Sequence, residues 1–458
     1  MRKISLDELP TSGFHKRVAF VAAGGPFCDG YLLGIVVAAL PLIAQDLALS
    51  AIQSGMIGAS TLLGMFLGGL IFGPITDKYG RHKTYVINLL VFVVCSAAHL
   101  FVRDTTLLIV LRLIMGVAIG ADYPIATALA TELLPRKLRG PVLSSFILCF
   151  WLGYCISISI GIFFVGGSDS WRYILASAAI PSMAFLVLRA KIPESPRWLL
   201  ISGKRAEASR IVTKHFGQNA DFEQLVRDTP AVAPRRGLGL SSIIELFNRG
   251  YGGAFVLCAT FWTCQVVPSF AIKTFQPVLL KSFGITQTLM GSVLITSFAV
   301  VGTALGMLYI NRIGRRPLIL VTFIISSVAL ALLATPVAAI TYIAIAGFIL
   351  FTVSEAAGSA LQYVYPNELF PTDLRATGMG ISLAVSRIGA AIGTFFFPLL
   401  MKSVGPANSI LIAAGLSVVG LCVCYAMAPE TTGRALDASP EEIGPGLSDT
   451  TSELRSRF

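Results

Sequence analysis

Six ionisable residues lie inside long apolar stretches of the chain, where a charge is hard to accommodate. They are Asp29, Arg112, Asp122, Lys273, Glu355 and Arg387. An unpaired charge at the centre of a membrane costs about 2.5 kcal/mol or more, so each of these side chains needs a partner or a cavity. Buried carboxylates can bind and release protons, and buried cations can hold an acid through charge-assisted hydrogen bonds. These residue types indicate proton exchange and recognition of a small anion.

The elements that carry these residues are long apolar runs. Hydrophobic residues make up 55% of the chain and charged residues 13%, and the mean hydropathy is +0.78, which places the chain in a membrane. Twelve runs are near the roughly 20 residues that cross a hydrocarbon core, where only helices pair all their backbone groups. The runs cover about 17–44, 52–74, 83–102, 107–130, 142–166, 172–190, 252–278, 287–310, 317–336, 339–364, 376–401 and 406–428.

The two halves of the chain repeat the same motifs. The pattern Glu-Leu-x-Pro-x-x-Leu-Arg occurs at 132–139 and 368–375, and Pro-Glu-Ser/Thr occurs at 193–195 and 429–431, with an offset of 236 residues in both cases. In an apolar protein, a repeat of half the chain indicates two membrane bundles that face each other with a binding site between them.

We therefore predict an all-α membrane protein with twelve transmembrane helices in two pseudo-symmetric six-helix bundles. The predicted segments are a first bundle at 1–190, a cytoplasmic loop at 191–249, a second bundle at 250–438 and a disordered cytoplasmic tail at 439–458.

The net charge of +11 is unevenly distributed. Of the 35 Lys and Arg residues, 28 fall on the side shared by both termini and the even-numbered loops, and four fall on the other side. This positive-inside bias places both termini in the cytoplasm of a multi-pass protein of the cell (inner) membrane, and it argues against nucleic acid as a partner. The eight cysteines lie in apolar runs without a Cys-x-x-Cys pair, so we expect no metal site. We also expect no cofactor, and a monomer in the lipid bilayer.

Three motifs resemble those of a known family. The segment Gly73-Pro-Ile-Thr-Asp-Lys-Tyr-Gly-Arg-His-Lys83 is similar to the loop 2–3 signature of the major facilitator superfamily. The segments Pro193-Glu-Ser-Pro-Arg-Trp-Leu-Leu200 and Pro429-Glu-Thr-Thr-Gly433 resemble the sugar-porter branch. The stretches at 24–31, 119–125 and 365–373 look closest to bacterial inner-membrane metabolite transporters of that branch. The resemblance implies a secondary active transporter that works by alternating access and is not an enzyme.

The resemblance also implies a gate. In the family, the acid at Asp77 caps a helix and pairs with the opposite bundle when the inside is closed. Asn311 stands at the equivalent place in the second half, so we expect a weaker lock there. The alternative is that these charges only set the topology. The other predicted gating residues are Gly80, Arg81, Glu132, Arg139, Glu194, Arg315, Glu368, Arg375 and Glu430.

Two acids are predicted to couple protons. Arg112 begins the pattern Arg-x-x-x-Gly-x-x-x-Gly, and in proton-coupled members that arginine faces an aspartate of the first span, so we expect Asp29 and Arg112 to pair. The alternative is a static structural ion pair. Asp122 lies in Gly-Ala-Asp-Tyr-Pro, which resembles an element of phosphate and organic-acid proton symporters and implies a second proton site. Its alternative is a carboxylate that bonds backbone at the wet end of the span.

Substrate recognition is predicted from the seventh span. It keeps one glutamine of the sugar-porter pattern, Gln265, and adds Lys273, while Arg387 in the eleventh span is a second cation, and Glu355 could neutralise only one of the two. We therefore predict proton-coupled symport of a small organic anion. A neutral sugar or polyol is the alternative, and a transporter-like membrane sensor is a further one. Other predicted substrate-binding residues are Trp151, Trp262, Gln362 and Tyr363.

Overall fold

The computed structural model describes residues 4–164, 166–167, 169–217, 219–229, 244, 246–370 and 374–432. Within these ranges the side chains at 73, 74, 77, 123, 339, 363 and 376 are outside the description. The predicted tail at 439–458 and part of the predicted loop, 230–243, also lie outside the described residues. The regular secondary structure of the described residues is helical, apart from one isolated backbone bridge.

Within the described residues, twelve spans are long and apolar enough to cross a membrane, which confirms the predicted fold class. In the first half they are α1 (Gly13–Asp46), α2 (Ala51–Tyr79), α3 (Arg81–Ala98), α4 (Thr105–Leu133), α5 (Arg136–Phe163) and α6 with α7 (Ser170–Ala176, Ala179–Arg189). In the second half they are α12 (Gly252–Thr274), α14 (Thr288–Ile313), α15 (Arg315–Leu333), α16 with α17 (Thr341–Ser359, Leu361–Leu369), α18 (Arg375–Ser403) and α19 (Pro406–Met427).

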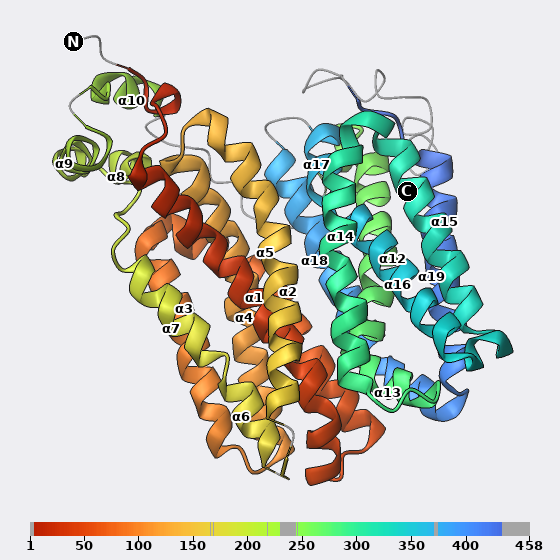
Figure 1. Ribbon diagram of the computed structural model, residues 1–458. Helices are drawn as coiled ribbons and strands as arrows, with labels where there is room; N and C mark the ends of the chain where they lie inside the picture. The colour runs from red at the N-terminus through yellow and green to blue at the C-terminus, as the bar shows by residue number, and fades with distance from the viewer. Residues whose placement is uncertain are drawn as a thin grey trace.

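Short helices lie at both ends of the spans. At the end that carries the N-terminus are η1 (Leu6–Glu8), α8 (Pro196–Ile201), α9 (Arg205–Phe216) and α10 (Phe222–Asp228). At the opposite end are η2 (His99–Phe101), α13 (Gln276–Ser282) and η3 (Pro336–Ala339). Figure 1 shows the two halves side by side, with α8, α9 and α10 on one end and α6 and α13 on the other. We call these the α8 end and the α13 end.

Equivalent helices pack in the same way in both halves. Helix α1 packs on α5 and α2 on α4 in the first half, and α12 packs on α18 and α14 on α16 in the second. Across the junction of the halves, α2 contacts α18 and α5 contacts α14. The glycines that follow Arg112 explain the close packing of α4 on α2. A Cβ at Gly116 or Gly120 would lie 2.1 or 2.2 Å from a carbonyl oxygen of α2, so the two backbones approach as only glycine allows.

The halves are joined more tightly at the α13 end than at the α8 end. One apolar core extends from the first half to Phe275, Leu279 and Leu280 of the second half. On α2, a Cβ at Gly55 would lie 2.3 Å from the carbonyl oxygen of Phe395. At the α8 end, the second half has a separate core that includes Tyr365, and this core contains no residue of the first bundle among the described residues. The structure is therefore closed at the α13 end.

The N-terminal segment packs on the loop helices of the α8 end. Ile4 forms a backbone bridge with Ala220, and Leu6 and Leu9 are buried against Val212 and Leu225. Residues 4–9 therefore tie the segment after α7 to the start of α1.

Candidate functional site

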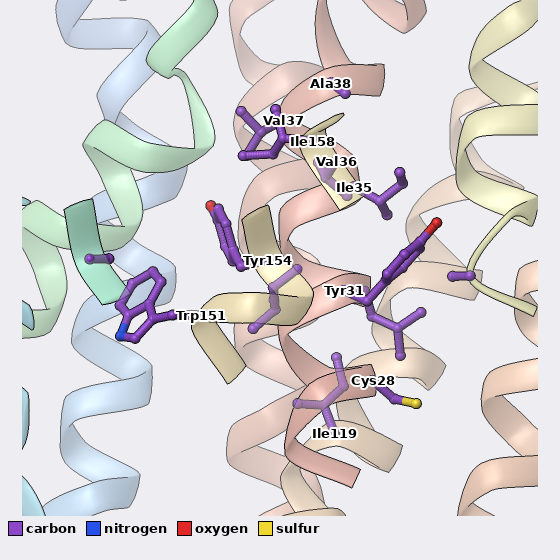
Figure 2. Close-up of a cluster of buried hydrophobic side chains, with 14 of the residues drawn as sticks. Cys28, Tyr31, Ile35, Val36, Val37, Ala38, Ile119, Trp151, Tyr154 and Ile158 are labelled. Carbon is purple, nitrogen blue, oxygen red and sulfur yellow. The ribbon is translucent and has the colours of Figure 1, made fainter. Parts of the chain in front are cut away.

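An ion pair lies at the junction of the two halves. Lys273 on α12 pairs with Glu355 on α16, and the Lys273 Nζ also donates to the Ser269 Oγ at 2.9 Å. The same Nζ lies 4.1 Å from the ring centroid of Trp151, which belongs to α5 of the first half. Figure 2 shows Trp151 on the side of α5 that faces the second half. Lys273 and Glu355 are 4% and 6% exposed, so Glu355 and the indole ring compensate the lysine charge inside the protein.

Two glutamines form a hydrogen-bonded chain beside this pair. Gln362 on α17 donates through its Nε2 to the Oε1 of Gln265 at 2.8 Å, and Gln265 donates to the carbonyl oxygen of Glu355 at 3.1 Å. Both predicted glutamines are therefore brought together with the predicted acid. A cavity of the second half is lined by Gln265, Thr322, Phe323, Ser326, Phe351, Glu355 and Ser417.

The second predicted cation, Arg387 on α18, is partly exposed. Its guanidinium carbon lies 5.5 Å from the ring centroid of Phe270 on α12. Arg387 is the cation that acts electrostatically on Asp29 of α1, which is 6% exposed and accepts no hydrogen bond at Oδ1 from the described residues. Trp262 is fully buried and packs with Leu62 across the junction. The side chain of Tyr363, also predicted to bind substrate, lies outside the described residues.

Asp29 and Arg112 do not form an ion pair in this conformation. Arg112 Nη1 donates instead to the carbonyl oxygen of Leu32 at 3.2 Å, about one turn further along α1. Arg112 is 2% exposed, and its Nε finds no acceptor among the described residues. The spacing in the sequence correctly brings α4 onto α1, but the arginine reaches the backbone one turn beyond the aspartate.

Asp122 is fully buried on α4, where Asn88 of α3 donates to its Oδ1 at 3.0 Å. Asp122 therefore bonds a side chain of α3. Under the alternative stated for Asp122 in the sequence analysis, its partners would be backbone groups at the wet end of the span. Two further residues surround this acid. Tyr85 on α3 and Arg189 on α7 are both 0% exposed, and the Arg189 guanidinium carbon lies 4.9 Å from the Tyr85 ring centroid.

The sequence prediction did not single out Asn88, Tyr85 or Arg189. Arg189 lies at the last residue of its span and so counts as a loop charge in a topology argument. Tyr85 and Asn88 are three residues apart on the buried face of α3, and that helical spacing was the available signal.

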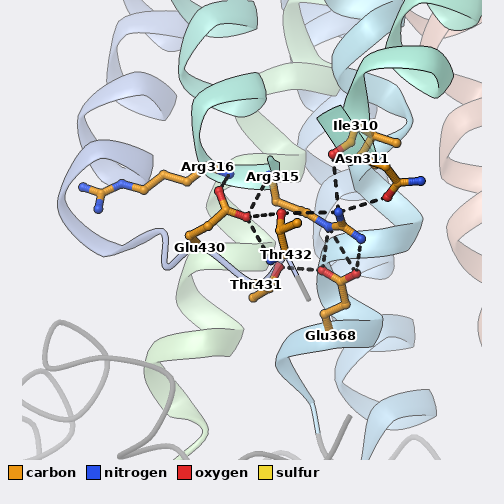
Figure 3. Close-up of polar contacts among 8 residues, drawn as sticks. All are labelled: Ile310, Asn311, Arg315, Arg316, Glu368, Glu430, Thr431 and Thr432. Atoms are coloured by element: carbon orange, nitrogen blue, oxygen red, sulfur yellow. Dashed lines mark hydrogen bonds and ion pairs between the residues drawn. The ribbon is translucent and has the colours of Figure 1, made fainter. Parts of the chain in front are cut away.

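The repeated motifs form one polar module in each half. In the second half, Glu430 accepts from the backbone N–H groups of Arg315 and Arg316, each at 3.0 Å, at the start of α15. The Arg315 guanidinium pairs with Glu368 at 2.7 Å and donates to Asn311 Oδ1 at 3.1 Å. Figure 3 shows these contacts around Arg315.

The first half has the equivalent module. Glu194 Oε1 accepts from the backbone N–H groups of Arg81 and His82, each at 3.0 Å, and Arg81 pairs with Glu132 at 3.3 Å. In both halves a carboxylate thus binds the amides at a helix N-terminus, where the helix dipole favours negative charge. Burial alone would raise the pKa of Glu430, but hydrogen bonds from Thr432 and from the Arg315 and Arg316 amides outweigh it and hold that pKa below its usual value.

Glycines make room for both carboxylates. Gly80 and Gly314 precede α3 and α15 with φ of 100° and 98°, a region that other residues rarely adopt. A Cβ at Gly80 would lie 2.3 Å from Glu194 Oε2, and one at Gly314 would lie 2.7 Å from Glu430 Oε2.

The two arginines that end the octapeptide repeats also have equivalent contacts. Arg139 Nε donates to the carbonyl oxygen of Leu134 at 2.9 Å, and Arg375 Nε donates to that of Phe370 at 3.3 Å. Arg139 also pairs with Asp7 of the N-terminal segment. The ion pairs of these repeated motifs, Arg81–Glu132, Arg139–Asp7 and Arg315–Glu368, each join residues of one half. The side chain of Asp77, the predicted lock between halves, lies outside the described residues.

Comparison with known proteins identifies the family. The family model for "Sugar (and other) transporter" matches residues 18–442. Over 435 residues the chain is 36% identical to YaaU of Escherichia coli (strain K12), covering 94% of this chain and 96% of YaaU. The chain belongs to the sugar transporter family. This confirms the resemblance to the sugar-porter branch, and the twelve spans make the protein a multi-pass membrane transporter.

Two further matches agree with this assignment. The chain is 33% identical over 437 residues to the inner membrane metabolite transport protein YgcS of the same strain, covering 95% of this chain and 96% of YgcS. Its fold matches the inward-open structure of the xylose transporter XylE from E. coli with a TM-score of 0.79 and 20% identity, covering 94% of this chain and 99% of XylE. At that identity the structural likeness establishes the fold.

Proposed function

We propose that the protein is a proton-coupled symporter that carries a small organic anion by alternating access of its two halves. The observation that supports it most is the placement of Arg387, a cation on α18 that lies beside the Phe270 ring at the junction of the halves, in addition to the cation Lys273 that already has an acid. Closure at the α13 end gives a conformation in which substrate would enter or leave at the α8 end, the end that the charge bias of the sequence places in the cytoplasm.

Coupling follows from how the charges are compensated. Lys273 already has Glu355 as its acid, so it contributes little net charge to a substrate. Asp29 is an acid on which Arg387 acts electrostatically, so protonation of Asp29 would lower the negative charge near Arg387. A carboxylate substrate could then take over that role. Proton and anion would bind together, and a single carboxylate would cross with one proton without net charge. We assign the proton to Asp29 and the carboxylate to Arg387.

A neutral sugar or polyol is the second candidate. Gln265 and Gln362 present amide groups beside the ion pair, and amides suit hydroxyl groups. The internal pairing of Lys273 also reduces the need for an anionic ligand. XylE is a proton:xylose symporter, so proton-coupled sugar transport occurs on this fold.

Matched ligands distinguish the two candidates. Purified protein would be screened by thermal shift with pairs that differ only at one end, such as an aldonic acid and the corresponding alditol. We expect stabilisation by the acid and little by the alditol. We also expect Arg387→Gln to weaken binding of the acid by about 2 kcal/mol, the scale of a lost hydrogen bond to a charged group. The alternative is supported if the alditol binds equally well or if both ligands lose equally.

Uptake into proteoliposomes then separates a transporter from a sensor. A ligand found by thermal shift should accumulate inside vesicles when the outside is made more acidic. Binding without accumulation would favour the sensor.

A further inference from the structure

A second polar cluster lies inside the first half. It consists of Tyr85 and Asn88 on α3, Asp122 on α4 and Arg189 on α7, and none of the four is more than 1% exposed. Helix α3 packs on α4 and α7, and α1 packs on the same two helices. The cluster is therefore enclosed by helices of one half, and it differs in place and composition from the site around Lys273. We call it the Asp122 cluster.

Close packing against α1 positions the acid. Asn88 holds one carboxylate oxygen of Asp122 by a hydrogen bond of 3.0 Å. The other oxygen occupies space left by Gly25 of α1, since a Cβ there would lie 2.0 Å from Asp122 Oδ2 and 2.4 Å from the Tyr85 hydroxyl oxygen. A glycine at this position thus allows both the carboxylate and the tyrosine hydroxyl to pack against α1. The hydroxyl donates to the carbonyl oxygen of Val21 at 3.4 Å, and Asp122 Oδ2 has no hydrogen-bond partner among the described residues.

The cluster contains a cation that cannot lose its charge by ordinary deprotonation. A guanidinium stays protonated in proteins, and all three side-chain nitrogens of Arg189 lack a hydrogen-bond acceptor among the described residues. An uncompensated buried charge costs several kcal/mol. The groups that act electrostatically on Arg189 are Tyr85 and Asp122 within the cluster, and Glu194 beyond the end of α7. Of the two acids, Glu194 is partly buried and Asp122 is fully buried, so Asp122 is the acid that shares the dry interior with Arg189.

The cluster also adjoins the proposed coupling acid. Asp29 lies four residues after Gly25 on α1, and side chains four apart on a helix are roughly 5 to 6 Å apart. Asp29 and Asp122 act electrostatically on each other, and two neighbouring acids in a dry site cannot both ionise at low cost. The cations on either side are Arg387 for Asp29 and Arg189 for Asp122. The remaining neighbours of the two acids are the Cys28 thiol on α1, which carries no positive charge, and Tyr85 and Asn88 on α3.

We propose that Arg189 is a positioning residue that keeps Asp122 ionised and thereby assigns the coupling proton to Asp29. Asp122 and Arg189 are then opposite charges that act on each other without a direct salt bridge, with Arg189 over the Tyr85 ring and Asn88 holding the carboxylate. Because Asp122 carries a fixed negative charge, Asp29 is neutral when both acids compete for one proton. The proposal rests on the proposed function only in naming Asp29 as the coupling acid.

Infrared spectroscopy tests this on purified protein without any substrate. The carbonyl stretch of a neutral carboxylic acid would be measured across pH in the parent protein, in Asp29→Asn and in Asp122→Asn. We expect the band near neutral pH to vanish in Asp29→Asn and to persist in Asp122→Asn. In Arg189→Gln we expect the protonation equilibrium of Asp122 to change by roughly tenfold or more toward the neutral acid, the effect of removing a nearby opposite charge.

The matched control is Lys191→Gln, because Lys191 is exposed and only two residues from Arg189. It should leave the Asp122 band unchanged. The proposal is overturned if Arg189→Gln and Lys191→Gln give the same band, or if the neutral acid of the parent protein belongs to Asp122.

Two further variants keep the test decisive if Arg189→Gln does not fold. Arg189→Lys keeps the charge and should keep Asp122 ionised, whereas Asn88→Ala removes the donor to the carboxylate and should increase neutral Asp122. Equal bands in these two variants would contradict the proposal. A result in which the Asp122 band responds as expected while no carboxylate is ever transported would reject the proposed function and leave the role of Arg189 intact.

Discussion

Removing the charge of Glu355 should destabilise the protein more than removing both charges of its ion pair. Glu355→Gln leaves Lys273 buried and charged at 4% exposure. Removing one partner of a buried pair costs about 3 to 5 kcal/mol. The Trp151 ring, 4.1 Å from the lysine nitrogen, still stabilises the lysine charge in the variant and so reduces this cost, because a desolvated cation-π contact contributes up to about 2 kcal/mol. The expected net loss is therefore about 1 to 3 kcal/mol.

The double variant Lys273→Met with Glu355→Gln removes the uncompensated charge and should recover most of that loss. Thermal unfolding of the purified protein in detergent would rank the parent, both single variants and the double variant. Lys281→Gln, at an exposed position on α13, is the charge-matched control and should behave as the parent. The reasoning is refuted if the double variant is less stable than Glu355→Gln, because Lys273 would then be stabilised by something other than Glu355.

Three further predictions concern the α8 end. Gly80→Ala and Gly314→Ala force a side chain into a backbone conformation that favours glycine, so each should lower the stability measured by thermal unfolding by about 1 to 3 kcal/mol. The control Gly140→Ala, whose Cβ would meet no atom within 4 Å, should not lower it. Equal effects of all three variants would contradict the role assigned to the positive φ. Glu430 has a lowered pKa, so its stabilising effect is present above about pH 4.5 and is lost as pH falls through the folded-state value; the difference in melting temperature between parent and Glu430→Gln should shrink on acidification, and a constant difference would contradict this. Asp7→Asn removes the acid shared by Arg139 and Arg197, so amide hydrogen exchange should increase in residues 4–9 and 205–228. Glu8→Gln is the control. Unchanged exchange in Asp7→Asn would mean that apolar contacts alone hold this segment.

The sequence predicted the parts of the molecule that repeat. The offset between Glu194 and Glu430 correctly indicated equivalent modules, because both the turn and the acid that binds it recur in the second half, with the acid 113 residues from Arg81 and 115 residues from Arg315. The twelve spans could also be predicted, since the need to pair every backbone group in lipid leaves helices as the solution.

Contacts that depend on helix rotation and register could not be predicted in this way. The spacing from Arg112 to Gly120 places α4 against α2, but it does not fix which turn of α1 the guanidinium reaches, and it reaches Leu32. The partner of Glu355 also stayed open, because two cations were available and only the structure brings Lys273 to it. Arg189 was missed because a charge at the end of a span is usually solvated, whereas here α7 carries it inward over Tyr85.

Uptake by Asp29→Asn protein tests the central claim of proton coupling most directly. The variant and the parent would be reconstituted in proteoliposomes with a carboxylate found by the thermal-shift screen, and Asp169→Asn, whose side chain is 71% exposed, would be the matched control. We expect Asp29→Asn to abolish accumulation driven by a pH gradient while exchange of labelled for unlabelled substrate continues. Accumulation against a gradient at the parent's level in Asp29→Asn would contradict the account.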